Sequence, residues 1–159
     1  TENVWGIVGM AKAMELAMKE DWSKTTKQIY WLENYITAIC PEAVIIGKSA
    51  TRLPNTSMIS MPNMDSTQQL IQFDLNRISI SNGSACSSGK VRKSPVLQAM
   101  GIPAEVARGC IRISLGAAML EQDVQQVANT WYKIHTRNNA QKKQENAKNL
   151  FGLSVDNAL

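Results

Sequence analysis

The stretch "CIRISLG", residues 110–116, carries a clear signal of secondary structure. Apolar and polar side chains alternate along it, which is the pattern of a β-strand with one buried face. In such a strand Ile111 and Ile113 point to one face, and Arg112 and Ser114 point to the other. The stretch therefore predicts a half-buried strand that carries an arginine on the face turned away from its apolar side chains.

A loop rich in serine, glycine and basic residues precedes this strand, with the sequence "SNGSACSSGKVRKSP" at residues 81–95. It contains Cys86. A free cysteine is usually buried as a small apolar residue, whereas this composition is typical of an exposed loop. Lys90, Arg92 and Lys93 follow closely, and neighbouring cations favour the reactive thiolate. Two interpretations stay open on the residues alone, a reactive cysteine on a loop and an incidental exposed thiol.

The flanking segments predict alternating helices and strands. Apolar residues at helical spacing indicate a helix that begins after Asn3, continues through a second apolar pattern and ends before Pro41. A buried strand at 43–47 and a half-buried strand at 56–61 follow. The remaining predicted elements are a helix at 65–75 capped by Asp65 or Ser66, a brief strand at 78–81, short helices that begin at Pro95 and Pro103, and a last helix with Leu120, Val124, Val127, Trp131 and Ile134 on its apolar side.

Length and composition limit the architecture and the compartment. The 159 residues, 44% of them hydrophobic, suffice for one core. Half-polar strands and one-sided helices predict a two-layer α/β domain, with about three or four strands and helices mainly on one face. No long apolar run or signal peptide pattern is present, so no membrane span is expected. Three cysteines at unrelated spacings favour a reducing compartment, and we expect a cytoplasmic protein.

The net charge of +4 is modest, and the basic stretch near the C-terminus has no interleaved aromatic residues. Nucleic-acid binding is therefore not expected. Cys40 ends an apolar helical stripe and Cys110 adjoins the strand, so both are expected to pack in the core. His135, the single histidine, lies between Lys133 and Arg137, and we expect a surface position for it and no metal site.

Two segments together carry a family resemblance. "SNGSACSSGKVRKSPVLQAMG" at 81–101, followed by "CIRISLG", resembles the C-terminal part of cysteine desulfurases of the NifS/IscS type. The segments "TENVWGIVGMAKAMELA" at 1–17 and "RLPNTSMISMP" at 52–62 extend the resemblance. These enzymes use pyridoxal phosphate and belong to class V of the aminotransferase fold, fold type I. The resemblance implies that residues 1–137 form the small C-terminal domain, opening with the long inter-domain helix, and that residues 138–159 form a polar helical or frayed tail.

The resemblance also implies the roles of three residues. Cys86 falls on the catalytic cysteine of the family, which takes the sulfur of L-cysteine as a persulfide and leaves alanine. Arg112 falls on the arginine that holds the substrate carboxylate, in keeping with the paired donors of a guanidinium. Thr1 falls on a threonine that reaches the cofactor phosphate of the neighbouring subunit in related dimers. The implied partners are L-cysteine, a sulfur acceptor or iron–sulfur scaffold protein, and a second subunit in the full-length enzyme.

The chain also departs from the family pattern. It contains no Ser-x-His pattern followed by the lysine that binds pyridoxal phosphate, and no second histidine to stack on the cofactor ring. We therefore expect the cofactor-bearing domain to be absent from this chain, no cofactor to be bound here, and the isolated chain to be inactive. The ending "NLFGLSVDNAL" also lacks the acceptor-binding ending expected of the housekeeping type. Two alternatives are a stand-alone sulfur carrier or redox thiol domain, and a non-catalytic interaction module.

Overall fold

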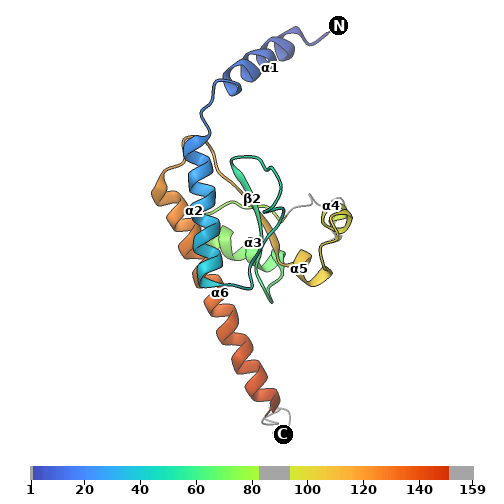
Figure 1. The fold of residues 1–159 in the computed structure, drawn as a ribbon, viewed down its shortest axis with the longest axis vertical. Coiled ribbons are helices and arrows are strands. Elements are labelled where there is room, and N and C mark those ends of the chain that lie inside the picture. Colours follow the sequence, from blue (N-terminus) through green and yellow to red (C-terminus); the bar gives the residue numbers. More distant parts are fainter. Residues whose placement is uncertain (1, 83–93, 151–159) are drawn as a thin grey trace.

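The computed structural model describes residues 2–82 and 94–150. Its strands form one small antiparallel sheet in the order β1-β2-β3, and helices pack mainly against one face of it (Figure 1). The elements are α1 (Val4–Ala17), α2 (Ser23–Ile39), β1 (Val44–Ile45), β2 (Thr56–Ser60), α3 (Ser66–Leu75), α4 (Pro95–Ala99), α5 (Ala104–Arg108), β3 (Cys110–Ser114) and α6 (Glu121–Leu150).

The register of the sheet follows the alternation expected from the sequence. In the pairing of β2 with β3, Ile59 lies opposite Ile111 and Met58 lies opposite Arg112. Ile59 and Ile111 are fully buried and belong to the main core, whereas Arg112 is exposed. The half-buried strand predicted at 110–116 is therefore confirmed, with the arginine on the face that its apolar neighbours avoid.

The main core lies between one face of the sheet and the helices α2, α3 and α6. Leu32 of α2, Phe73 of α3 and Trp131 of α6 are each fully buried there, together with the isoleucines of β3. A smaller cluster around Leu97 and Cys110 lies beneath α4 and α5. The structure thus confirms a small α/β domain of two layers, with helices mainly on one face.

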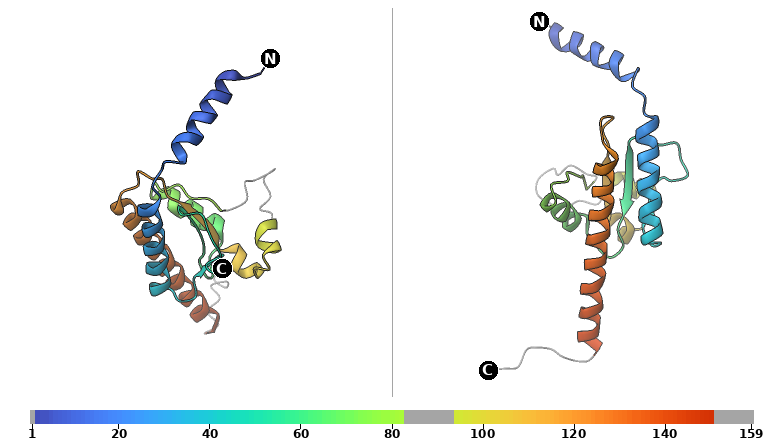
Figure 2. Two further views of the ribbon diagram at one scale, coloured as in Figure 1. Left: turned by 45° about the horizontal axis from the view of Figure 1, so that its top comes forward. Right: turned by 90° about the vertical axis from the view of Figure 1, so that its left-hand side faces the viewer.

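The first 39 residues form two helices and not the single continuous helix expected from the sequence. A break from Met18 to Trp22 separates α1 from α2, and Figure 2 shows α1 projecting from the body of the domain. Asn3 caps α1 as predicted, since its side chain accepts a hydrogen bond from the Gly6 N–H at 3.0 Å. No residue of α1 is buried, and its apolar side chains are exposed.

Two further expectations are wrong. His135 is 8% exposed, because its ring stacks on the buried indole of Trp131 with a centroid distance of 5.1 Å. Burial lowers the pKa of His135 below its ordinary value. The segment 78–81 forms no named strand and contributes only an isolated bridge between Ser81 and Arg112.

Within residues 2–82 and 94–150, no helix is long and apolar enough to cross a membrane.

Candidate substrate-binding face

Arg112 lies near the middle of β3, exposed on the face of the sheet opposite the main core. The main chain of β3 pairs with β2 on one side, where Met58 lies opposite Arg112. Its neighbours on the same face include Thr56 and Ser114, whose hydroxyl oxygens are 3.2 Å apart. Within the described part of the chain, no carboxylate forms an ion pair with Arg112. The guanidinium is therefore carried on a strand and can donate hydrogen bonds to an external carboxylate.

The other edge of β3 binds the segment that leads toward Cys86. The Arg112 N–H donates to the Ser81 carbonyl oxygen at 2.6 Å, and the Ser81 N–H donates to the Arg112 carbonyl oxygen at 3.1 Å. The main chain of Arg112 is thus part of the pairing on both sides. Such pairing limits the movement of the residue more than a loop position would.

The beginning of β3 is anchored by tight packing and hydrogen bonds. The carbonyl oxygen of Gly109 accepts a hydrogen bond from the buried Gln69 side chain at 2.8 Å. A Cβ added at Gly109 would collide with the carbonyl oxygen of Met61, so only glycine fits without a shift. The Ser60 hydroxyl donates to the Val106 carbonyl oxygen at 2.7 Å, which ties β2 to α5. These contacts fix the position of the strand that carries Arg112.

The structure locates one of the three site residues predicted from the sequence. Cys86 and Thr1 lie outside the described residues, so their distance from Arg112 is not defined. The other two cysteines are buried as predicted, with Cys40 0% and Cys110 2% exposed. Burial raises the pKa of the Cys110 thiol to about 11 and also raises the pKa of Cys40.

A buried ion pair, which the sequence did not lead us to expect, connects α2 to the loop before β2. The carboxylate of Glu33 accepts two hydrogen bonds from the Arg52 guanidinium, at 2.6 and 3.0 Å, and one from the Ser57 hydroxyl at 2.6 Å. Burial alone would raise the pKa of Glu33, but the hydrogen bonds from Arg52 and Ser57 outweigh it, and the pKa is lowered. The available signal was a glutamate within the apolar stripe of α2, next to Leu32.

The described residues contain no candidate metal site, and the single histidine lies apart from Arg112. Within residues 2–82 and 94–150, no group of three or more His, Cys, Asp or Glu residues could hold a metal ion. His135 stacks on Trp131 on the helical side of the domain, away from the face of Arg112. It is therefore not placed to stack on a ring bound beside Arg112.

Comparison with known proteins gives a consistent family match. Residues 1–127 match the family model described as aminotransferase class V. A cysteine desulfurase IscS of Clostridium botulinum is 39% identical over 139 residues, which cover 84% of this chain and 35% of the relative. A cysteine desulfurase of Sinorhizobium fredii is 39% identical over 132 residues, covering 80% of this chain and 34% of the relative.

A solved structure with a similar fold comes from the same group of proteins. The NifS-like protein of Rickettsia africae superimposes with a TM-score of 0.73 at 33% identity, covering 86% of this chain and 36% of that protein. The chain therefore spans about a third of the length of the relatives that it matches. The resemblance stated from the sequence and the expected fold class are both confirmed.

Proposed function

The chain belongs to the class V aminotransferase family, and on this premise we propose that it is the small domain of a cysteine desulfurase. In this proposal Cys86 takes sulfur from L-cysteine, and Arg112 binds the carboxylate of that substrate. The observation that carries the proposal is the position of Arg112. Its guanidinium is exposed on a rigid strand, has no ion-pair partner among the described residues, and lies on the strand bound by the segment that leads to Cys86.

Chain connectivity supports a meeting of Cys86 with a substrate bound by Arg112. Ser81, which pairs with Arg112, precedes Cys86 by five residues. Five residues reach at most about 18 Å when fully extended. The cysteine is therefore tethered near the arginine, while the strand keeps the arginine in place. A positioned carboxylate and a thiol that can approach the substrate sulfur are the two requirements of sulfur transfer.

The proposed reaction can be written for the residues of this chain. The thiolate sulfur of Cys86 forms a bond to the sulfur of substrate cysteine while the carbon–sulfur bond of the substrate breaks. The carbon keeps the electron pair of the broken bond and takes up a proton, so alanine leaves and a persulfide stays on Cys86. Arg112 neutralises and orients the substrate carboxylate throughout.

We place the pyridoxal phosphate of the reaction outside this chain, apart from a contact proposed for Thr1. The chain has no lysine after a Ser-x-His pattern, and its single histidine is buried against Trp131. The exposed apolar surface of α1 supports a second protein body, because Trp5 and Met10 are 88% and 62% exposed and would gain by being covered. We propose that the body covering α1 supplies the cofactor.

The test is alanine formation from L-cysteine with added pyridoxal phosphate. We expect no alanine above a cofactor-only control from the 159-residue chain by itself. Alanine should form when the chain is joined to a cofactor-binding domain of a class V relative. Alanine formed by the isolated chain would contradict the placement of the cofactor, and a joined protein that folds and binds cofactor but forms no alanine would contradict the proposed function.

A further inference from the structure

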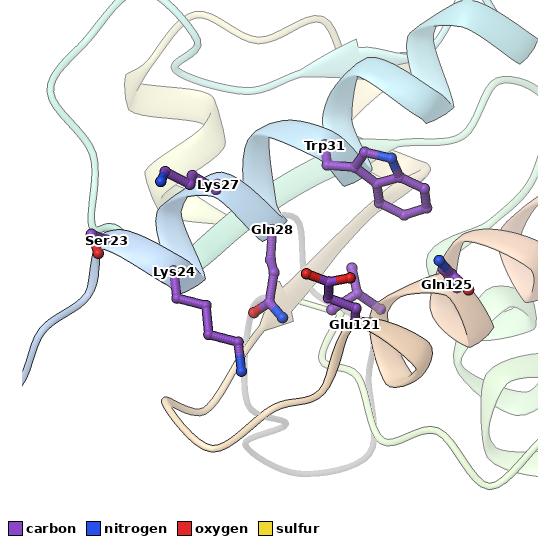
Figure 3. A pocket seen from close by; sticks show the side chains of 8 residues that line it. Ser23, Lys24, Lys27, Gln28, Trp31, Glu121 and Gln125 are labelled. Atoms are coloured by element: carbon purple, nitrogen blue, oxygen red, sulfur yellow. The ribbon is translucent and has the colours of Figure 1, made fainter.

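A hollow of about 550 Å³ lies between the first turns of α2 and α6 (Figure 3). It is on the helical side of the domain, whereas Arg112 is on the opposite face of the sheet. Its volume is within the range of small-molecule sites in proteins. The hollow is lined by Ser23, Lys24, Lys27, Gln28, Trp31, Glu121, Val124 and Gln125.

One wall of the hollow is positively charged. The helices α2 and α6 run side by side in the same direction, so the positive ends of both helix dipoles lie at this end of the domain (Figures 1 and 2). Lys24 and Lys27 are exposed on α2, and neither forms an ion pair with another described residue. The carboxylate of Asp21 accepts hydrogen bonds from the N–H and hydroxyl of Ser23. Its negative charge offsets part of the positive charge at this end of α2.

Gln28 carries a buried acceptor without a partner beside this wall. The side chain is 7% exposed, and its Nε2 donates to the Met119 carbonyl oxygen at 3.3 Å, which fixes the orientation of the amide. Its Oε1 has no hydrogen-bond partner among the described residues. A buried acceptor without a donor is unfavourable, so a ligand that supplies a donor gains binding energy there. In Figure 3 the Gln28 amide points into the space between Lys24 and Glu121, where a ligand N–H could satisfy it.

The opposite wall, on α6, supplies a negative charge, and Trp31 of α2 supplies apolar surface. The carboxylate of Glu121 faces the Gln28 side chain across the hollow (Figure 3). The indole of Trp31 is 43% exposed and stacks on Tyr35 with a centroid distance of 5.5 Å, so it offers apolar surface to a ligand. A ligand that matches these walls carries an anionic group, a cationic N–H donor and an apolar part.

We propose that this hollow binds a free α-amino acid with a large apolar side chain, in its zwitterionic form. The carboxylate of the ligand contacts Lys24, whose side chain lies beside the Gln28 amide (Figure 3). Its ammonium group donates to Glu121 and to Oε1 of Gln28, and its side chain packs on Trp31. This site is independent of the proposed sulfur transfer, because α2 and α6 form it without Arg112 or the segment of Cys86.

The first test uses L-phenylalanine as the probe, titrated into the 159-residue chain and followed by the NMR signals of the Trp31 indole N–H and the Gln28 side-chain amide. Both signals should shift saturably. N-acetyl-L-phenylalanine lacks the ammonium group and phenethylamine lacks the carboxylate, so each should bind at least about tenfold more weakly. No saturable shift with L-phenylalanine would overturn the proposal. Equal binding of N-acetyl-L-phenylalanine or of inorganic phosphate would also overturn it, because the hollow would then be an anion site.

The second test uses variants that remove one charge each. Glu121→Gln and Lys24→Met should each weaken L-phenylalanine binding by at least about tenfold, since each removes one charged contact. Glu105→Gln on α5 is the matched control, because Glu105 is exposed and does not line the hollow, and it should leave binding unchanged. Far-UV circular dichroism verifies that each variant is folded. Unchanged binding in folded Glu121→Gln would overturn the assignment of the ammonium group.

Discussion

Ser81 and Arg112 exchange two main-chain hydrogen bonds, of 3.1 and 2.6 Å, at the edge of β3 opposite β2. The pair joins the strand that displays the guanidinium to the segment that continues toward Cys86. In the proposed function, substrate binding and sulfur transfer belong to Arg112 and Cys86, and this pair of hydrogen bonds connects the segments that carry them. Because the two proposed roles belong to different side chains, substitution of Arg112 and substitution of Cys86 should have different effects.

Replacing Arg112 should impair substrate binding specifically. In the chain joined to a cofactor-binding domain, Arg112→Ala removes a charge-assisted contact to the carboxylate, which is worth about 2–3 kcal/mol. We expect KM for L-cysteine to rise by about a hundredfold. Arg112→Lys keeps the charge but loses the paired donors, so its effect should be intermediate.

Arg108→Ala is the control for this measurement. Arg108 is a largely exposed arginine on α5, 3.7 Å from Asp65, and it should leave KM unchanged. A KM for Arg112→Ala equal to that of Arg108→Ala would remove the substrate-binding role of Arg112.

The three thiols should differ strongly in reactivity. Cys40 and Cys110 are buried, and burial raises the pKa of both, that of Cys110 to about 11. Reactivity follows exposure and thiolate fraction, so limited iodoacetamide treatment of the folded chain should modify Cys86 first. Peptide mass spectrometry reads the order. Similar early modification of all three thiols would contradict this assignment.

Gly109 should be intolerant of a side chain. A Cβ at this position meets the carbonyl oxygen of Met61, and the backbone would have to move, which costs about 1–3 kcal/mol. Gly109→Ala should lower Tm accordingly. Gly116→Ala is the matched control, because a Cβ at Gly116 meets nothing within 4 Å, and it should leave Tm nearly unchanged. Equal Tm values for the two variants would show that the backbone around Gly109 has room for a Cβ and contradict the close contact with Met61.

The buried pair of Glu33 and Arg52 should stabilise the fold above acidic pH. The pKa of Glu33 is lowered, so its contribution is present above the ordinary glutamate pKa and is lost as the pH falls through the lowered value. Glu33→Ala at neutral pH should cost about 3 kcal/mol in the free energy of unfolding, because Arg52 loses its partner. Glu15→Ala, in an exposed pair with Lys12 and Lys19, should change it little. Urea unfolding measures both, and equal losses would contradict the role of Glu33.

Protonation of His135 should destabilise the domain at a higher pH than protonation of Glu33. Burial lowers the pKa of His135 below its ordinary value of 6.5, so between these two values the unfolded state binds a proton and the folded state does not. The free energy of unfolding should therefore fall as the pH drops below about 6.5. His135→Gln should flatten this dependence in urea unfolding curves. An unchanged slope in the variant would assign the effect to other groups.

The parts of the fold that could be predicted are those that depend on local pattern. Alternation in β3 placed Ile111 and Arg112 on their correct faces, and Asn3 and Pro95 marked true helix starts. Burial of His135 depends on stacking with Trp131 against the rest of the core, so no spacing rule indicates it. The break between α1 and α2 contains no proline or glycine, and apolar periodicity does not reveal it. The available signal was Asp21 before Ser23, since these residue types favour a helix start and Asp21 accepts the Ser23 N–H.

The candidate site, too, could be predicted from the sequence only where it depends on local pattern. The strand position of Arg112 followed from alternation, whereas its pairing with Ser81 is a tertiary contact that the local pattern did not contain. The hollow between α2 and α6 unites residues that lie far apart in the sequence, such as Gln28 and Glu121. Only the packing of the two helices brings such residues together.

The most direct test of the central claim is the mass of the cysteine-containing peptides after reaction with L-cysteine. The chain joined to a cofactor-binding domain is treated with L-cysteine, alkylated and digested. We expect one added sulfur atom on the peptide that contains Cys86, none on those of Cys40 and Cys110, and none anywhere in Cys86→Ala. An added sulfur on Cys40 or Cys110, or an unmodified Cys86 in a protein that releases alanine, would contradict it.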